Sequence, residues 1–135
     1  MKKRKLIILT VLIGVVLIVI IGAIVAKSRI EASLEQLKNM PVEDVDLSKI
    51  PDGTFAGTYE VFPVAADVEV TVKDHKILSI ELVRHENGKG AAAESIPQKI
   101  VDTQTLKVDT VSGATYSSKV ILKAIENALK NAVGG

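Results

Sequence analysis

Hydrophobic residues are distributed unevenly along this 135-residue chain. Residues 6–26, LIILTVLIGVVLIVIIGAIVA, contain no charged side chain, whereas the rest of the chain alternates apolar and polar positions over short distances. An apolar helix of about 20 residues is long enough to cross the hydrocarbon core of a bilayer, and it satisfies its own backbone hydrogen bonds there. The pattern therefore predicts one transmembrane helix over residues 6–26.

The charges around this apolar segment predict its orientation. Residues 2–5 are KKRK, and basic residues before a transmembrane segment favour a cytoplasmic N-terminus. We therefore expect a cytoplasmic tail over residues 1–5 and an extracytoplasmic domain after the anchor. A cleaved signal peptide is the alternative, with Ala26 and Ser28 as small residues at the cleavage site. Its apolar core usually has only about 7 to 15 residues, so we favour an uncleaved single-pass anchor in the cell membrane.

The next segment, residues 27–51, is predicted to connect the anchor to the domain. Ile30, Leu34 and Leu37 recur at helical spacing, which predicts a juxtamembrane helix over Lys27–Met40 that ends at Pro41. An acidic linker follows it up to Pro51.

From residue 52 onward the pattern first predicts strands. Residues 54–62 are rich in β-branched and aromatic residues, and residues 68–73 alternate Val with polar residues. Asp74 and His75 form a short turn before a second alternating segment, residues 77–83. A turn this short allows only an antiparallel hairpin.

Helical patterns follow the strands. They cover residues 91–104, where Pro97 fits only a first turn, and residues 116–133, with a short extended stretch at 107–111 between them. The second helix has the longer apolar stripe, made by Val120, Ile121, Ala124, Ile125, Ala128, Leu129 and Ala132. Strands followed by helices indicate an α+β domain over residues 52–135, in which the helices pack on one face of an antiparallel sheet.

Composition removes several classes of function. The chain has no Cys, which excludes disulfides, thiolate metal sites and iron–sulfur ligation, and its two His residues lack the spacing of a zinc or haem site. Redox chemistry would therefore need an organic cofactor. Without residues 2–5 the chain has 13 basic and 16 acidic residues, and it has no Trp, so it gives no indication of nucleic-acid binding.

The segment with the most chemical information is residues 109–118, DTVSGATYSS, at the start of the last helix. Gly113 permits a tight backbone turn, and the hydroxyl groups of Ser112, Thr115, Ser117 and Ser118 lie where the free N–H groups and the dipole of a helix favour an anion such as phosphate. Hydroxyl groups that simply cap the helix are the alternative.

This segment resembles the attachment motif of the FMN-binding domain family. The family includes the C subunit of the sodium-pumping NADH:quinone reductase, the G subunit of the Rnf complex and many small membrane-anchored proteins. The motif positions are Asp109, Ser112, Gly113, Ala114, Thr115, Ser117 and Ser118. Residues 52–59, 70–80 and 96–106 resemble further elements of the family, so the resemblance extends over about residues 52–132.

The resemblance implies FMN as cofactor and assigns Thr115 as the residue that carries it through a phosphoester bond. A flavin transferase that uses FAD and a divalent metal makes this bond in such proteins. Asp109 then orients the turn or is recognised by the transferase, with an Asx turn as the alternative. Ser117 and Ser118 either bind the phosphate or cap the helix.

A loop over residues 85–90, HENGKG, resembles a family loop that lies against the flavin, Glu-Thr-Pro-Gly-x-Gly, but it lacks the Thr and Pro. His85, Gly88, Lys89 and Gly90 are therefore secondary candidates for FMN contacts, and Lys89 would balance the charge of a reduced flavin. A solvated loop is the alternative.

The resulting hypothesis is an extracytoplasmic electron-transfer module with membrane or extracytoplasmic redox partners and no catalytic residues of its own. No G-x-G-x-x-G follows a strand, so nothing indicates a nicotinamide site. The alternatives are a sensor or accessory subunit that holds FMN without a bond, and an inert tethered domain.

Overall fold

The computed structural model describes residues 1–86 and 90–134 and divides the chain into two compact units, residues 1–33 and 34–135. The first unit lies within one continuous helix, α1 (Lys2–Asn39), so the predicted anchor and juxtamembrane helix are parts of a single element. Among the described residues, α1 is the one helix long and apolar enough to cross a membrane. Its length and position fit either a single-pass anchor or a signal sequence.

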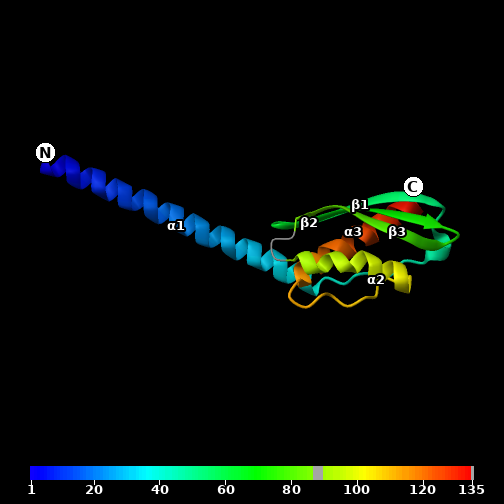
Figure 1. Cartoon of the computed structure of the whole chain (residues 1–135). Coiled ribbons are helices and arrows are strands. Elements are labelled where there is room, and N and C mark those ends of the chain that lie inside the picture. Colours follow the sequence, from blue (N-terminus) through cyan, green and yellow to red (C-terminus); the bar gives the residue numbers. More distant parts are fainter. Residues whose placement is uncertain (87–89, 135) are drawn as a thin grey trace. The chain divides into compact units, whose positions relative to one another are not determined.

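The second unit contains a three-stranded antiparallel sheet in the order β1-β2-β3, drawn in green shades in Figure 1. The strands are β1 (Gly53–Val61), β2 (Val64–Lys73) and β3 (Lys76–Glu86). The predicted hairpin around Asp74 and His75 is confirmed. A second hairpin joins β1 to β2 through Phe62 and Pro63, because β2 begins four residues before the predicted strand.

Two helices cover one face of the sheet, as expected for an α+β domain. Helix α3 (Thr115–Gly134) packs on β1 and β2, and α2 (Ile96–Thr103) packs on β3. Every residue of the predicted apolar stripe on α3 is buried. These side chains face Val68, Val70 and Val72, the buried positions of β2. The apolar face of the helix and the apolar face of the strand, each set by its own side-chain repeat, therefore form one core.

The predicted helix over residues 91–104 is shorter than expected. Residues 91–95 form a 3-10 helix, η2 (Ala91–Ser95), and α2 begins at Ile96 with Pro97 in its first turn. Gln104 ends α2 in the left-handed conformation, with φ 58°. Its side-chain amide accepts a bond from the Ile77 N–H and donates one to the Ile77 carbonyl, both at 2.8 Å. The Gln104 side chain thereby makes the two hydrogen bonds to Ile77 of β3 that the backbone of a neighbouring strand would make.

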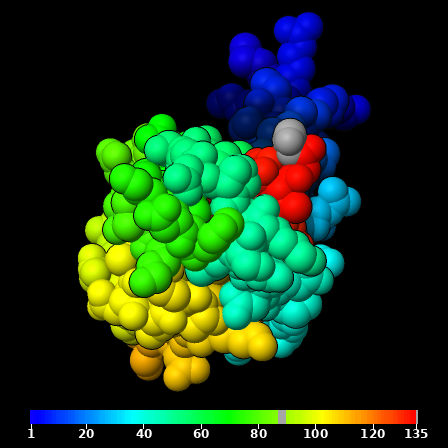
Figure 2. Space-filling view, turned by 90° about the vertical axis from the view of Figure 1, so that its right-hand side faces the viewer, coloured from blue at the N-terminus to red at the C-terminus, as the bar shows by residue number. Residues whose placement is uncertain are grey.

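The far end of the domain from the start of α3 is closed by turns. Figure 2 shows it as a continuous surface of teal residues near position 50, the green β2–β3 turn and yellow α2. The Asp52 carboxylate accepts a 2.8 Å hydrogen bond from the Asp74 N–H, and the His75 ring lies 3.2 Å from the Leu47 carbonyl of η1 (Leu47–Lys49). These contacts hold the segment before β1 against the β2–β3 turn.

The acidic linker is held on α3 by a buried carboxylate. Glu126 is 1% exposed; it accepts hydrogen bonds from Lys123 at 2.9 Å, from Lys130 at 2.6 Å and from the Glu43 N–H at 3.2 Å. Burial by itself raises the pKa of this carboxyl, but the bonds from Lys130, Lys123 and Glu43 outweigh it and leave the pKa lowered. Lys130 also contacts the Glu43 carboxylate, and its pKa is raised to about 12 by Glu126 and Glu43.

We expect Glu126→Ala to reduce the free energy of unfolding by about 3 kcal/mol, because it removes the acceptor of three hydrogen bonds, one of them from Lys123, whose side chain is largely buried. Lys130→Ala should reduce it by less than about 1 kcal/mol, because this ammonium is half exposed and is screened by water. Urea unfolding of both variants measures the difference. Equal effects would contradict a role for the buried carboxylate.

The same carboxylate gives stability a defined pH dependence. A pKa that is lower in the folded state than the ordinary 4.5 means that the ionised form stabilises the fold above that pH. Asp44 also has a lowered pKa, since hydrogen bonds from Thr105 and the Leu106 and Val45 N–H groups outweigh its burial. The midpoint of urea unfolding should therefore fall as pH decreases below about 4.5, and Glu126→Gln should flatten this dependence.

Candidate functional site

The predicted attachment segment lies at one end of the sheet. Two hydrogen bonds from α3 to β1 show which end it is. Asn131 donates to the Ala56 carbonyl at 3.4 Å, and Asn127 donates to the Thr58 carbonyl at 2.9 Å. Helix α3 therefore runs antiparallel to β1. Ten residues of helix from Asn127 back to Ser117 extend about 15 Å, which matches about four to five residues of strand. The start of α3 thus comes level with the Val61–Val64 end of the β1–β2 hairpin.

A tight turn precedes α3. The Ala114 N–H donates to the Val111 carbonyl at 2.9 Å, and Gly113 has φ 80°. A positive φ at the third position of such a turn is characteristic of type II turns and favours glycine. A Cβ on Gly113 would meet no heavy atom within 4 Å, so space is open beside the turn.

Thr115 is the first residue of α3 and is partly exposed, and Ser112 and Gly113 before it are exposed, whereas Ala114 is buried. The first N–H groups of an α-helix have no acceptor within the helix, and the helix dipole places positive potential there. A hydroxyl, free N–H groups and open space therefore occur together, which suits a phosphate group on this residue.

The two serines after Thr115 differ in their surroundings. The Ser118 hydroxyl donates to the Ala114 carbonyl at 2.7 Å and accepts from the Val111 N–H at 2.9 Å, so it closes the turn from inside the protein. The Ser117 hydroxyl is buried and has no hydrogen-bond partner among the described residues. A buried hydroxyl without a protein partner is unfavourable, and here it leaves a hydrogen-bonding position for a water or a ligand group.

Asp109 lies six residues before Thr115 on the connector after α2, with its side chain exposed. Its carboxylate makes no hydrogen bond to the part of the chain that the structure describes, so the Asx turn is not formed. It borders a shallow cavity of about 400 Å³ together with Lys99, Asp102, Thr103, Lys107 and Val108. The connector over residues 107–111 contains neither helix nor strand.

The second candidate segment differs from the expected loop. Strand β3 continues through His85 to Glu86, so His85 is a strand residue. Its ring is 3% exposed, and its Nδ1 lies 3.1 Å from Glu94 Oε1. Gly90 is buried next to η2, while Gly88 and Lys89 lie outside the described residues. Glu94 was not predicted, because its contact with His85 depends on how the chain returns after β3.

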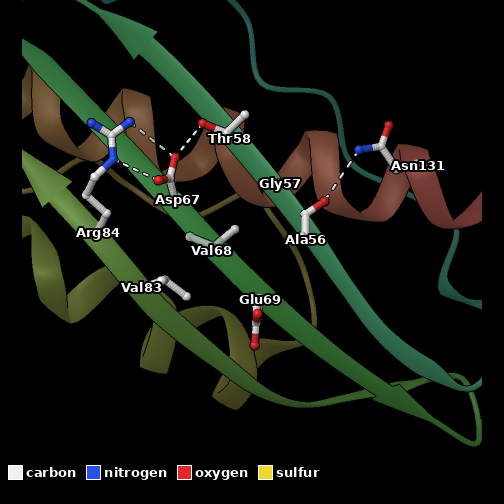
Figure 3. A pocket seen from close by; sticks show the side chains of 9 residues that line it. All are labelled: Ala56, Gly57, Thr58, Asp67, Val68, Glu69, Val83, Arg84 and Asn131. Atoms are coloured by element: carbon white, nitrogen blue, oxygen red, sulfur yellow. Dashed lines mark hydrogen bonds and ion pairs between the residues drawn. The ribbon is translucent and has the colours of Figure 1, made fainter.

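A separate groove lies on the open face of the sheet and contains none of the predicted site residues. It has a volume of about 540 Å³ and is drawn in Figure 3. Its lining residues are Ala56, Gly57, Thr58, Asp67, Val68, Glu69, Val83, Arg84 and Asn131. Arg84 pairs with Asp67 at 2.7 Å and also with Glu60 and Glu86, and bonds to Asp67 and Glu86 raise its pKa. The guanidinium is thereby neutralised, which does not favour a phosphate here.

The start of α3 therefore fits a flavin phosphate better than the open groove does. It offers an accessible hydroxyl, unpaired N–H groups and a buried hydroxyl without a partner. Beside Arg84 the Thr58 hydroxyl already donates to Asp67, and carboxylates surround the cation.

Comparison with known proteins agrees with this assignment of the cofactor. A model of the FMN-binding domain family matches residues 65–130, which extend from β2 into α3 and include the S-G-A-T run. NADH:acrylate oxidoreductase of Vibrio harveyi is 33% identical over 112 residues. The match covers 78% of this chain and 11% of that relative, so the chain spans a small part of its length. The chain belongs to the FMN-binding domain family, and FMN is the cofactor that this family membership implies.

Proposed function

We propose that this protein is a membrane-anchored, extracytoplasmic electron carrier that holds FMN through a phosphoester bond to Thr115. The observation that carries the proposal is the position of Thr115, which is partly exposed and begins α3 directly after the Gly113 turn. A covalent bond is useful to a protein outside the cell, because a flavin lost by dissociation there is not recovered.

Attachment by a flavin transferase follows from simple group transfer. The Thr115 oxygen forms a bond to the FMN phosphorus of FAD, and the bond between that phosphorus and the bridging oxygen of the pyrophosphate breaks. AMP leaves, and the hydroxyl proton passes to a base of the transferase. No electrons are exchanged. Exposed Ser112 and Gly113 leave the transferase room to approach, and exposed Asp109 serves its recognition.

Once attached, FMN supplies the electron chemistry, and the residues of this chain hold it. Ser117 offers its buried hydroxyl and the first turn of α3 offers N–H groups to the phosphate. Ser118 keeps the turn closed from the protein side. No residue of the chain is needed as a catalytic acid or base, which fits a carrier rather than an enzyme.

The tether favours redox partners in or near the membrane. In the second unit, the Lys119 ammonium donates to the Met40 carbonyl at 2.8 Å, and Leu37 is buried in the core. The chain thus enters this unit beside the first turns of α3. A flavin at Thr115 would lie close to that entry point, and a single anchor raises its effective concentration near membrane partners. The name of the Vibrio harveyi relative describes electron transfer from NADH to acrylate, which supports a redox role for the shared segment.

The proposal is tested on the full-length protein co-expressed with a flavin transferase. Its intact mass should exceed that of the protein made alone by the mass of FMN less one water, and the band in a denaturing gel should fluoresce. FMN that is released on denaturation would instead support the second candidate, a non-covalent FMN-binding sensor or accessory subunit, which the unpartnered Ser117 hydroxyl also suits. Absence of flavin under all conditions would overturn both.

A further inference from the structure

Two buried polar atoms of this domain have no hydrogen-bond partner within the described residues: Ser117 Oγ and His85 Nε2. Leaving such an atom unpaired in the interior is unfavourable. Ser117 belongs to the attachment motif, but the role of His85 is open. A cost of this kind in a folded protein suggests that something else occupies the vacant bonding position when the protein is functional.

The surroundings of His85 hold its ring in one orientation. His85 is paired with Ala66 of β2, whereas its neighbour Arg84 is paired with Asp67 on the open face, so the His85 ring lies on the face that the helices cover. Its Nδ1 is 3.1 Å from Glu94 Oε1 on η2. The ring is 3% exposed and the Glu94 side chain 51% exposed. One nitrogen is thus bonded to a carboxylate and the other is directed into the protein without a partner.

His85 and the start of α3 lie at the same end of the domain. Ala66, the partner of His85, is itself paired with Tyr59, close to the Val61–Val64 end of the sheet. The antiparallel course of α3 along β1 brings Ser117 level with that end. Element η2, which carries Glu94, packs against α3. In Figure 1 the orange start of α3 lies beside the start of yellow-green α2, which follows η2.

We propose that His85 Nε2 forms a hydrogen bond to the bound FMN and that Glu94 is a positioning residue that fixes the ring for this contact. The inference rests on the proposed FMN site at the start of α3 and adds a second contact to it. When Nδ1–H donates to Glu94, the Nε2 of a neutral ring is an acceptor. Its FMN partner is then an O–H or N–H donor, and FMN carries such donors on its ribityl chain and at N3 of its ring.

Amide side chains distinguish this role from a purely structural one. In His85→Gln the amide reaches the position of Nε2, whereas in His85→Asn it reaches only that of Nδ1. A contact with FMN through Nε2 therefore predicts that Gln substitutes for His and Asn does not. A structural contact with Glu94 predicts the opposite order.

The experiment titrates FMN into the full-length, unflavinylated protein in detergent and follows quenching of flavin fluorescence. We expect His85→Asn to bind FMN about tenfold more weakly than wild type, and His85→Gln to stay within about twofold of wild type. Glu94→Gln keeps the shape of the side chain but weakens its hydrogen bond to the His85 ring. Its FMN affinity should therefore lie between those of His85→Asn and His85→Gln. The melting temperature of each apoprotein reports whether it folds.

A second measurement is used if non-covalent FMN binding is too weak to titrate or if a variant unfolds without the cofactor. In the flavinylated full-length protein, iodide should quench FMN fluorescence more strongly in His85→Asn than in wild type or His85→Gln. Affinity and quenching that are the same in all three proteins would overturn the inference, and so would the reverse order of Asn and Gln. If wild type itself neither binds FMN nor becomes flavinylated, the proposed function fails instead, and the two failures are thereby distinguished.

Discussion

Replacement of Thr115 by valine should abolish covalent flavin attachment completely. Valine has nearly the shape of threonine but no oxygen that can form an ester, and position 115 is only partly buried, so the first turn of α3 should still form. Co-expression with the flavin transferase followed by intact-mass measurement should give the unmodified mass alone. The denaturing gel should show no fluorescent band at a protein level equal to that of wild type.

Two control variants make this result specific. Thr110→Val removes the other threonine hydroxyl of the segment, at a position that is also half-buried, and should leave the flavin content unchanged. Thr115→Ser keeps a hydroxyl and should retain at least part of the flavin. If Thr115→Val remains modified, the ester lies on another residue, with Ser112 and Ser117 as the next hydroxyls to replace.

The other large effect is expected at Gly57, in the middle of β1. A Cβ there would lie 2.1 Å from the Ala124 carbonyl oxygen and 2.5 Å from the Ala128 nitrogen, which both belong to the backbone of α3. A backbone cannot move aside as a flexible side chain can, so Gly57→Val must push α3 away from the sheet. We expect a loss of at least about 4 kcal/mol, beyond the usual range for overpacking.

A loss of that size is comparable to the whole stability of a small domain. The melting temperature should fall by about 20 °C or more, and much of the protein should be unfolded when expressed. Ala56→Val is the matched control, because Ala56 is the adjacent residue of β1 and is exposed. It should change the melting temperature by only a few degrees. Similar melting temperatures for the two variants would contradict the close packing of α3 on β1.

Several features follow from the sequence alone because they depend on local periodicity. The apolar segment over residues 6–26 is part of a helix, the hairpin at Asp74 and His75 is formed, and the stripe on α3 is buried. Each of these predictions needs only the repeat of side chains along one element. The family and its cofactor could also be inferred early, since the S-G-A-T run is a short contiguous segment.

The tertiary structure decided what depends on residues far apart in the chain. The bonds of the Gln104 side chain to the Ile77 backbone and the extension of β3 to Glu86 depend on neighbouring segments. The contact of His85 with Glu94, the burial of Glu126 under the linker and the need for glycine at position 57 likewise come from neighbours on other elements. Periodicity reports which face of an element is buried but not what lies against it, and so it could not reveal these contacts.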